Sequence, residues 1–434
     1  MALFGTDGVR GVAGEFLTAE LALSLGRAAA TISPADPPQV LIVRDTRESG
    51  EMLEAALAAG IAAGGGHALL GGVLPTPGAA VLVRRYGFDL AAVVSASHNP
   101  YEDNGIKFFG PAGTKIDDEQ EAEIERLLNH PGSRIGRVRE LHGAAGDYVR
   151  ELELRFRDLD LSGRRVLLDC ANGATYRVAP EIFRRLRADV DAVAVEPDGR
   201  NINLGCGSTH IERLAERVDG HDAAFAFDGD GDRVLAVDRN GVVVDGDELM
   251  ALAALHLRER GRLAGGGVAV TVMTNYGFHR AMSAAGIAVT TTPVGDRHVL
   301  AELLRRGWAL GGEQSGHIID TGFVPAGDGV AAALLALEAL GDRDLAERGA
   351  MEKLPQRLVN VRVADRDALA GAHQVWTAVE REGERLEGRG RVLVRPSGTE
   401  PLVRVMVEAP DERECDEIAA RLVDVVEAEL GARA

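Results

Sequence analysis

Short runs of β-branched and other apolar residues alternate with alanine- and leucine-rich stretches along most of the 434-residue chain. Such alternation is typical of α/β units, in which buried parallel strands are connected by helices. Three of the apolar runs begin similar series of elements: QVLIVRDTR from 39, RRVLLDCANG from 164 and GVAVTVMTN from 267. The hydrophobic pattern therefore predicts an α/β protein with at least three such regions.

Each region continues in the same way. A later strand runs into a proline turn, at Pro77, Pro197 and Pro293, and a further helix and apolar strand then lead into a polar loop. The polar loops read SASHNP from 95, DGDGDR from 228 and GGEQSGH from 311. This recurrence favours an internal triplication, although alanine-rich strands also resemble one another by chance.

The pattern changes after about residue 355. A strand, a charged helix, two strands joined by RPSGTEP and a final helix follow in that order. This β-α-β-β-α arrangement predicts a separate, smaller α+β domain.

Charge and composition narrow the function. The net charge of −19 argues against a general nucleic-acid or anionic-membrane binder, because both need positive surface. Three cysteines without a CxxC pair indicate neither a disulfide framework nor a structural zinc site. No signal peptide and no run of 18 apolar residues is present, so we expect a soluble cytoplasmic protein.

Lysine is rare in this chain. Of the 48 lysine and arginine residues, only Lys107, Lys115 and Lys353 are lysines. Because arginine stays protonated whereas lysine can release its proton, a retained lysine is a candidate for chemistry.

The loop FAFDGDGDRV carries Asp228, Asp230 and Asp232, with glycines between them. Three carboxylates in one tight loop repel one another unless a cation lies among them, and their hard oxygens suit Mg²⁺. A solvated acidic turn is the structural alternative. An EF-hand is excluded, because its sixth and twelfth positions are Arg233 and Arg239. An aspartate-nucleophile phosphatase, which also has DxD after an apolar strand, stays open.

Ser97 is followed directly by His98, but the GxSxG motif of a hydrolase nucleophile is absent. Adjacent side chains do not normally face each other as nucleophile and base, so we interpret His98 as a neighbour that shapes the loop. Ser97 is better explained as a phosphoryl carrier whose oxygens complete the Mg²⁺ site. We expect burial near cations to lower the pKa of Lys107 enough for proton transfer, and His317 is a second candidate.

RPSGTEPLVR from 395 combines arginines, hydroxyls and free backbone N–H groups, which is the composition of a phosphate cradle. A hairpin turn with ordinary charges is the alternative. GDGVAA at 327–332 matches GxGxxA, but it follows a loop and not a strand. We therefore predict that Asp328 caps a helix and that no dinucleotide binds there.

SASHNP, DGDGDR, GEQSGH and RPSGTEP together resemble the motifs of the α-D-phosphohexomutase superfamily, in that family's order along the chain. FGTDGVRG, RDTRESG and NINLGCGSTH resemble its bacterial members that act on glucosamine phosphate. The resemblance implies three similar mixed-sheet α/β domains and a smaller C-terminal α+β domain around a central cleft. The expected boundaries are 1–148, 149–247, 248–354 and 355–434.

The resemblance also implies residue roles by position. Ser97 corresponds to the phosphoserine, and the Mg²⁺ ligands are Ser97, Asp228, Asp230 and Asp232. Arg10 and Arg233 are implied to balance charge around the phosphoserine. The residues implied to bind the substrate are Glu313 and Ser315 for the sugar hydroxyls, and Arg395, Ser397, Gly398, Thr399 and Arg404 for the phosphate that is not transferred.

The implied reaction interconverts glucosamine 6-phosphate and glucosamine 1-phosphate through a 1,6-bisphosphate that turns over in the cleft, and it supplies amino sugars for cell-wall precursors. A relative acting on glucose or mannose phosphates, a phosphatase using Asp228, and a phosphosugar sensor without turnover are the alternatives. The resemblance implies a homodimer. It leaves open whether a kinase or a sugar bisphosphate first phosphorylates Ser97.

Overall fold

The computed structural model describes residues 3–5, 7–132, 134–397 and 400–431. The chain divides into two compact units. Unit 1 comprises Met1–Met273 and Ala288–Arg348, and unit 2 comprises Thr274–Ile287 and Gly349–Ala434. None of the helices in the described residues has the length and apolar character needed to span a membrane.

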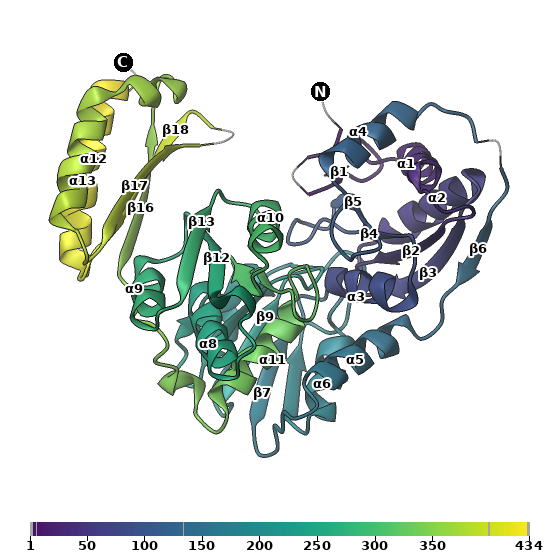
Figure 1. The fold of residues 1–434 in the computed structure, drawn as a ribbon, viewed down its shortest axis with the longest axis horizontal. Coiled ribbons are helices and arrows are strands. Elements are labelled where there is room, and N and C mark those ends of the chain that lie inside the picture. Colours follow the sequence, from purple (N-terminus) through teal and green to yellow (C-terminus); the bar gives the residue numbers. More distant parts are fainter. Residues whose placement is uncertain (1–2, 6, 133, 398–399, 432–434) are drawn as a thin grey trace. The chain divides into compact units, whose positions relative to one another are not determined.

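The first region of unit 1 is a mixed sheet in the order β1-β5-β4-β2-β3-β6, with helices on both faces (Figure 1). Alternate residues of β2 point to opposite faces, so Val40 and Ile42 join the core beneath α1 and α2. The strands are β1 (Val9–Val12), β2 (Gln39–Arg44), β3 (His67–Val73), β4 (Leu90–Val94), β5 (Asp103–Phe109) and β6 (Arg137–Glu140). The helices are α1 (Ala19–Ile32), α2 (Gly50–Ala63), α3 (Thr76–Tyr86), α4 (Asp118–Leu127) and α5 (Ala144–Arg155).

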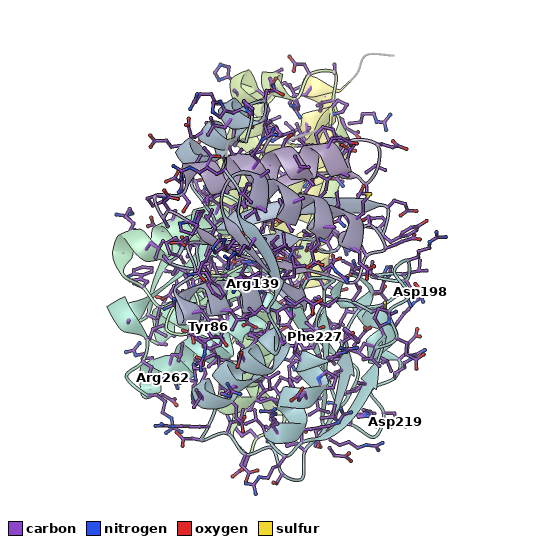
Figure 2. The ribbon with its side chains drawn as sticks, turned by 90° about the vertical axis from the view of Figure 1, so that its right-hand side faces the viewer. Tyr86, Arg139, Asp198, Asp219, Phe227 and Arg262 are labelled. Carbon is purple, nitrogen blue, oxygen red and sulfur yellow. The ribbon has the colours of Figure 1, made fainter. Side chains whose placement is uncertain are left out.

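The second region is a sheet in the order β11-β10-β9-β7-β8. β9 is buried along its whole length and ends at Phe227, which Figure 2 labels. The strands are β7 (Arg165–Asp169), β8 (Asp189–Val193), β9 (Ala223–Phe227), β10 (Val234–Asp238) and β11 (Val243–Val244). The helices are α6 (Val178–Arg185) and α7 (Ile211–Ala215).

The third region of unit 1 is a sheet in the order β13-β12-β14-β15. Its strands are β12 (Gly267–Thr271), β13 (Ala288–Thr292), β14 (Leu310–Gly312) and β15 (Ile318–Asp320), and its helices are α8 (Gly246–Glu259), α10 (Asp296–Arg306) and α11 (Gly329–Leu340). Asp328 caps α11, because its side chain accepts a hydrogen bond from the Ala331 N–H. This confirms the predicted cap at that position.

The three sheets of the described part of unit 1 share one strand order. β5-β4-β2-β3, β10-β9-β7-β8 and β15-β14-β12-β13 match strand for strand when the third sheet is followed from its other end. In each of these series the first and second strands pair antiparallel, whereas the second and third strands, and the third and fourth, pair parallel. The common order and orientation confirm the predicted triplication and the mixed sheets.

Unit 2 contains the predicted β-α-β-β-α series, in a sheet of order β16-β18-β17. Its elements are β16 (Gln356–Arg362), α12 (His373–Arg385), β17 (Arg391–Pro396), β18 (Leu402–Glu408) and α13 (Glu412–Leu430), together with α9 (Tyr276–Ala284) from the middle of the chain. The fully buried carboxylate of Glu408 connects α9 to the three-stranded sheet through hydrogen bonds. It accepts hydrogen bonds from the Tyr276 N–H at 2.8 Å, from Gln356 at 2.7 Å and from Arg391 at 2.8 and 3.2 Å.

Candidate active site

The polar loops of unit 1 occupy equivalent places in its three sheets. They connect β4 to β5, β9 to β10 and β14 to β15, and each begins at the carboxyl end of a strand within the parallel part of the sheet. Ligand sites of open α/β sheets commonly lie at this edge. The repeated strand order thus gives each region a loop that can contribute to one site.

Ser97 and Asp228 bring the first two of these loops together. The Ser97 hydroxyl donates a hydrogen bond to Asp228 Oδ2 at 2.5 Å, although 131 positions separate the two residues. Ser97 is 2% exposed and has a φ of 52°, a left-handed conformation that non-glycine residues rarely adopt. An ordinary solvated loop serine does not fit these observations.

Asp228, Asp230 and Asp232 are buried, and one carboxylate oxygen of each lies within 4.8 Å of the others. The alternative of a solvated acidic turn is therefore wrong. Asp230 Oδ1 and Asp232 Oδ1 are buried and accept no hydrogen bond from any residue that the structure describes. Unpartnered buried carboxylate oxygens are costly, and a hard cation such as Mg²⁺ would satisfy them. The donor set thus fits the expected metal.

The electrostatics of the loop agree with this interpretation. Burial raises the pKa of Asp228 well above its usual range, and the neighbouring carboxylates Asp232 and Asp230 raise it further. Burial and Asp230 likewise raise the pKa of Asp232. Like charges packed in a site of low polarity disfavour ionisation, so a cation bound here would lower these pKa values.

Glycines make the close packing of this loop possible. A Cβ at Gly229 would lie 2.5 Å from the Ser97 carbonyl oxygen, so only glycine fits between the first two loops. Gly231, between Asp230 and Asp232, has a φ of 73°, a left-handed conformation that glycine adopts without steric cost. The glycine spacing of DGDGDR is thus required by the backbone geometry.

Lys107 lies on β5 and is 1% exposed. Its Nζ donates a hydrogen bond to Asp230 Oδ2 at 2.7 Å and lies 3.3 Å from Asp7 Oδ2. Burial alone would lower the pKa of Lys107, but Asp230 and Asp7 outweigh it and raise the pKa above its usual value. The predicted lowering of this pKa is therefore wrong for this geometry, because carboxylates surround the amine where cations were expected. The same ion pair holds the pKa of Asp230 low despite its burial.

His98 lies beside Ser97, and the two predicted arginines are near enough to His98 to affect its pKa. His98 Nδ1 is 3.4 Å from the Ser97 Oγ. Burial, together with Arg233 and Arg10, lowers the pKa of His98 to about 4, so the ring is neutral at pH 7. Arg10 forms an ion pair with Asp7, and Arg233 Nε lies 3.8 Å from Asp232 Oδ1.

The third loop places His317 and Glu313 beside the aspartate loop. Arg233 and His317 form an isolated β-bridge, and His317 Nε2 lies 3.9 Å from Asp232 Oδ2. Glu313 is buried and accepts a hydrogen bond from the Gly295 N–H at 3.0 Å, whereas Ser315 is exposed. Ser97, the aspartates, Lys107 and His317 are thus brought together, as the motif positions predict.

A cavity of about 480 Å³ opens beside this cluster within unit 1. Asp232, His317 and Thr76 contribute to its wall, and the Thr76 hydroxyl donates to Asp230 Oδ2 at 2.7 Å. Lys115 and Asp296 line it as well. The carboxylate loop is therefore accessible from a cavity large enough for a small ligand.

The predicted phosphate cradle lies in unit 2. Arg395 on β17 and Arg404 on β18 are directly opposite each other, which is unfavourable for like charges unless an anion binds between them. Burial and Arg404 lower the pKa of Arg395, and Arg404 Nε is buried without a hydrogen-bond acceptor among the described residues. Ser397 is buried and accepts from the Glu400 N–H at 3.3 Å. The predicted ligands Gly398 and Thr399 lie outside the described residues.

The sequence did not predict the contacts of three further residues of the site, although Lys115 was noted as one of the three retained lysines. Arg47 and Asn203 donate hydrogen bonds to the carbonyl of Ser97, at 2.8 and 2.9 Å. Lys115 Nζ contacts both Asp7 and, at 2.6 Å, Asp296. Arg47 lies in RDTRESG and Asn203 in NINLGCGSTH, two strings that carried the family resemblance. Those strings could have marked the residues as candidates, but their contacts with Ser97 depend on the fold.

Comparison with known proteins agrees with the fold. Family models described as phosphoglucomutase/phosphomannomutase alpha/beta/alpha domains I, II and III match residues 1–134, 146–241 and 245–358, and the model of the C-terminal domain matches 358–425. A phosphoglucosamine mutase of Moorella thermoacetica is 52% identical over 97% of this chain and 98% of its own. That of Rubrobacter xylanophilus is 53% identical over 99% of this chain and 98% of its own.

A solved structure of a phosphoglucomutase/phosphomannomutase family protein from Burkholderia thailandensis has the same fold. Its TM-score is 0.84 at 24% identity, over 99% of this chain and 97% of that chain. The repeated sheets and the serine beside an aspartate loop define a phosphohexomutase. The chain belongs to the phosphoglucomutase/phosphomannomutase family, and relatives about half identical to it are phosphoglucosamine mutases.

Proposed function

We propose that this protein is a phosphoglucosamine mutase that interconverts glucosamine 6-phosphate and glucosamine 1-phosphate. The observation that carries the proposal is the contact between Ser97 and Asp228, which puts a phosphate acceptor directly beside a carboxylate loop suited to a cation. The identity of about one half to full-length phosphoglucosamine mutases favours glucosamine phosphate over glucose or mannose phosphate.

We propose Mg²⁺ as the cofactor, held by Asp228, Asp230, Asp232 and an oxygen of phosphorylated Ser97. When bound, Mg²⁺ neutralises the charge that develops on a phosphoryl group during transfer. The protein's own contribution is to hold three carboxylates in fixed positions, with Thr76 and Lys107 bonded to one oxygen of Asp230. That oxygen has two donors, which leaves Asp230 Oδ1 for the cation.

The first transfer breaks the bond between phosphorus and Ser97 Oγ and forms a bond to the free hydroxyl of the sugar. Lys107 is the first candidate to move the proton. Its carboxylate neighbours raise its pKa, so it is protonated near neutral pH; it would give this proton to Ser97 Oγ as the phosphoryl group leaves and take the hydroxyl proton in its place. Ser97 Oγ then donates to Asp228, as in the structure. His317 is the second candidate for proton transfer, and Arg10 and Arg233 balance the phosphate charge.

The 1,6-bisphosphate must then turn over, so that its other phosphate is returned to Ser97 and the proton to the sugar oxygen. Glu313 and Ser315 are proposed to bind sugar hydroxyls in both orientations. The pair Arg395 and Arg404 is proposed to hold whichever phosphate is not being transferred, together with Ser397, Gly398 and Thr399. Guanidinium groups suit this role, because they bind phosphate through two parallel hydrogen bonds.

Intact mass spectrometry and a coupled assay test the proposal. The purified protein should carry one phosphate, Ser97→Ala should carry none, and glucosamine 1-phosphate should be a better substrate than glucose 1-phosphate or mannose 1-phosphate. An equal or higher rate with either of the other sugars would reassign the substrate.

Labelled sugar bisphosphate separates the mutase from an aspartate-nucleophile phosphatase. An acid-stable label that is lost in Ser97→Ala supports the mutase. An alkali-labile label that is lost in Asp228→Asn would contradict it, and ligand binding without turnover would indicate a sensor. The homodimer, the cytoplasmic location and the source of the first phosphate stay predictions.

A further inference from the structure

The segment that carries Ser97 is held from one side by Arg47, in the loop between β2 and α2. The Arg47 side chain has no exposed surface, so each of its five N–H groups needs a partner within the protein. Nε donates to Asp45 Oδ2 at 2.8 Å. The other donors all meet main-chain carbonyls, those of Ser97 at 2.8 Å, Asn99 at 2.9 Å, Asp103 at 2.9 Å and Pro100.

Asn203, from the second region of unit 1, holds the same segment from the other side. Its amide donates to the carbonyls of Ser97 at 2.9 Å and Asn99 at 3.2 Å, the two that Arg47 Nη2 also reaches. A carbonyl oxygen has two lone pairs, so each of these oxygens is saturated by one bond from each side chain. The approach depends on Gly229, where a Cβ would lie 2.8 Å from Asn203 Nδ2.

The N–H of Ser97 is tied to the same group of residues. It donates to Ser95 Oγ at 3.0 Å, and Ser95 donates to Asp45 Oδ2 at 2.6 Å, the oxygen that also binds Arg47 Nε. Both polar groups of the Ser97 backbone are thus fixed, in a left-handed conformation that is unfavourable for a non-glycine residue. Such a conformation persists only where the surroundings determine it.

We propose that Arg47 and Asn203 are positioning residues for phosphoryl transfer, which act by fixing the Ser97 and Asn99 carbonyls so that Ser97 Oγ points at the aspartate loop. The inference rests on the proposed function, because it concerns the serine that carries the phosphate. Transfer in line requires the oxygen of Ser97, the phosphorus and the sugar hydroxyl to be aligned. A displacement of about 1 Å costs on the order of 100-fold in rate.

Asn203→Asp tests the proposal, since it keeps the shape of the side chain but turns an oxygen toward two carbonyl oxygens. Asn201→Asp is a matched control two positions earlier, where the side-chain amide donates to the Glu196 carbonyl at 2.9 Å and accepts from the Asp198 N–H at 3.0 Å, within its own loop. We expect kcat of Asn203→Asp to fall about 10- to 100-fold with KM changed less than about twofold. Asn201→Asp should have the same kcat as the unaltered protein.

Asn203→Ser is a milder second variant that decides the matter if Asn203→Asp does not fold. The ³¹P resonance of phosphorylated Ser97 supplies a readout that general destabilisation would not change. In either variant that folds, we expect this resonance to narrow and to move toward that of free phosphoserine, because the segment is no longer fixed.

The outcomes are distinct. A normal kcat and an unchanged ³¹P resonance in the folded Asn203 variants would overturn the proposal while leaving the mutase intact. Equal loss of kcat in Asn201→Asp would also overturn it, since the effect would then belong to the loop in general. Absence of turnover in the unaltered protein would overturn the proposed function and this inference with it.

Discussion

Lys115 illustrates how much of the site depends on single side chains. Its ammonium group contacts Asp7, which lies beside Lys107, and Asp296, whose Oδ2 is 3.8 Å from His317 Nε2. Lys115 thus connects the surroundings of both candidate proton carriers. A compact ammonium can lie between two carboxylates where a planar guanidinium requires a different geometry.

We predict that Lys115→Arg lowers kcat by about tenfold, because Asp7 and Asp296 must move apart to accommodate the larger group. A coupled assay of glucosamine 1-phosphate formation measures the effect. Lys353→Arg, at an exposed lysine of unit 2, serves as the control and should keep full activity. Full activity of Lys115→Arg would show that charge alone is required at this position.

The carboxylate loop predicts that Asp232→Asn changes the stability of unit 1 differently in EDTA and in Mg²⁺. Asp232→Asn removes one of three mutually repelling buried carboxylates, so in EDTA we expect unit 1 to be stabilised by about 1 to 3 kcal/mol. With Mg²⁺ the unaltered protein should gain more stability than the variant, because a ligand has been lost. Thermal unfolding with and without Mg²⁺ measures both effects, and a variant that responds to Mg²⁺ as the unaltered protein does would contradict the assignment.

At the scale of elements, local pattern predicted the strands and the polar loops that follow them. The first strands from 39, 164 and 267 correspond to β2, β7 and β12, and the cap at Asp328 was foreseen from its position before an apolar helix. Contacts between distant segments were not predictable in this way. The bond from Asn203 to Ser97 spans 106 positions, and the surroundings of Lys107 depend on Asp7, which lies in FGTDGVRG but was given no role from the sequence.

Asp328, the residue that caps α11, makes the free energy of unfolding depend on pH. Burial raises the pKa of Asp328 to about 7, although hydrogen bonds from Ala331 and Tyr148 oppose the shift. The unfolded chain loses this proton near pH 4, so between about pH 4 and 7 the folded state binds more protons. The contribution of Asp328 to the free energy of unfolding therefore falls as pH rises, by at most about 1.4 kcal/mol per pH unit.

We predict that Asp328→Asn removes this dependence, since the amide keeps the bonds to Ala331 and Tyr148 without a titrating proton. The difference in unfolding temperature between the variant and the unaltered protein should grow in favour of the variant from pH 5 to pH 7.5. A difference that stays constant with pH would show that Asp328 is ionised in the folded protein throughout.

At the scale of the whole molecule, the chain forms two compact units, and unit 2 takes one helix, α9, from between β12 and β13. Glu408 connects α9 to the C-terminal sheet through Tyr276 and Arg391. Both units therefore need residues from separate parts of the chain. Neither corresponds to one continuous stretch of sequence.

We predict that Glu408→Gln destabilises unit 2 by about 3 kcal/mol, because it removes a buried ion pair while Arg391 stays partly buried. Hydrogen exchange should accelerate in α9 and β17 while the sheets of unit 1 keep their protection. Glu412→Gln, at an exposed position in the first turn of α13, is the control. Unchanged exchange in α9 would show that Glu408 does not hold that helix.

The repeated strand order of unit 1 distributes the chemistry over three copies of one scaffold. The proposed phosphate carrier, the carboxylates and the predicted sugar-binding glutamate each come from a different copy, so no single copy holds a complete set. A break in the exposed turn at Arg157 and Asp158 would leave the first sheet whole in one fragment and the other two in the second. Each fragment alone would then be inactive, and enzymatic activity would measure their reassembly. This makes the fold a suitable scaffold for a split reporter.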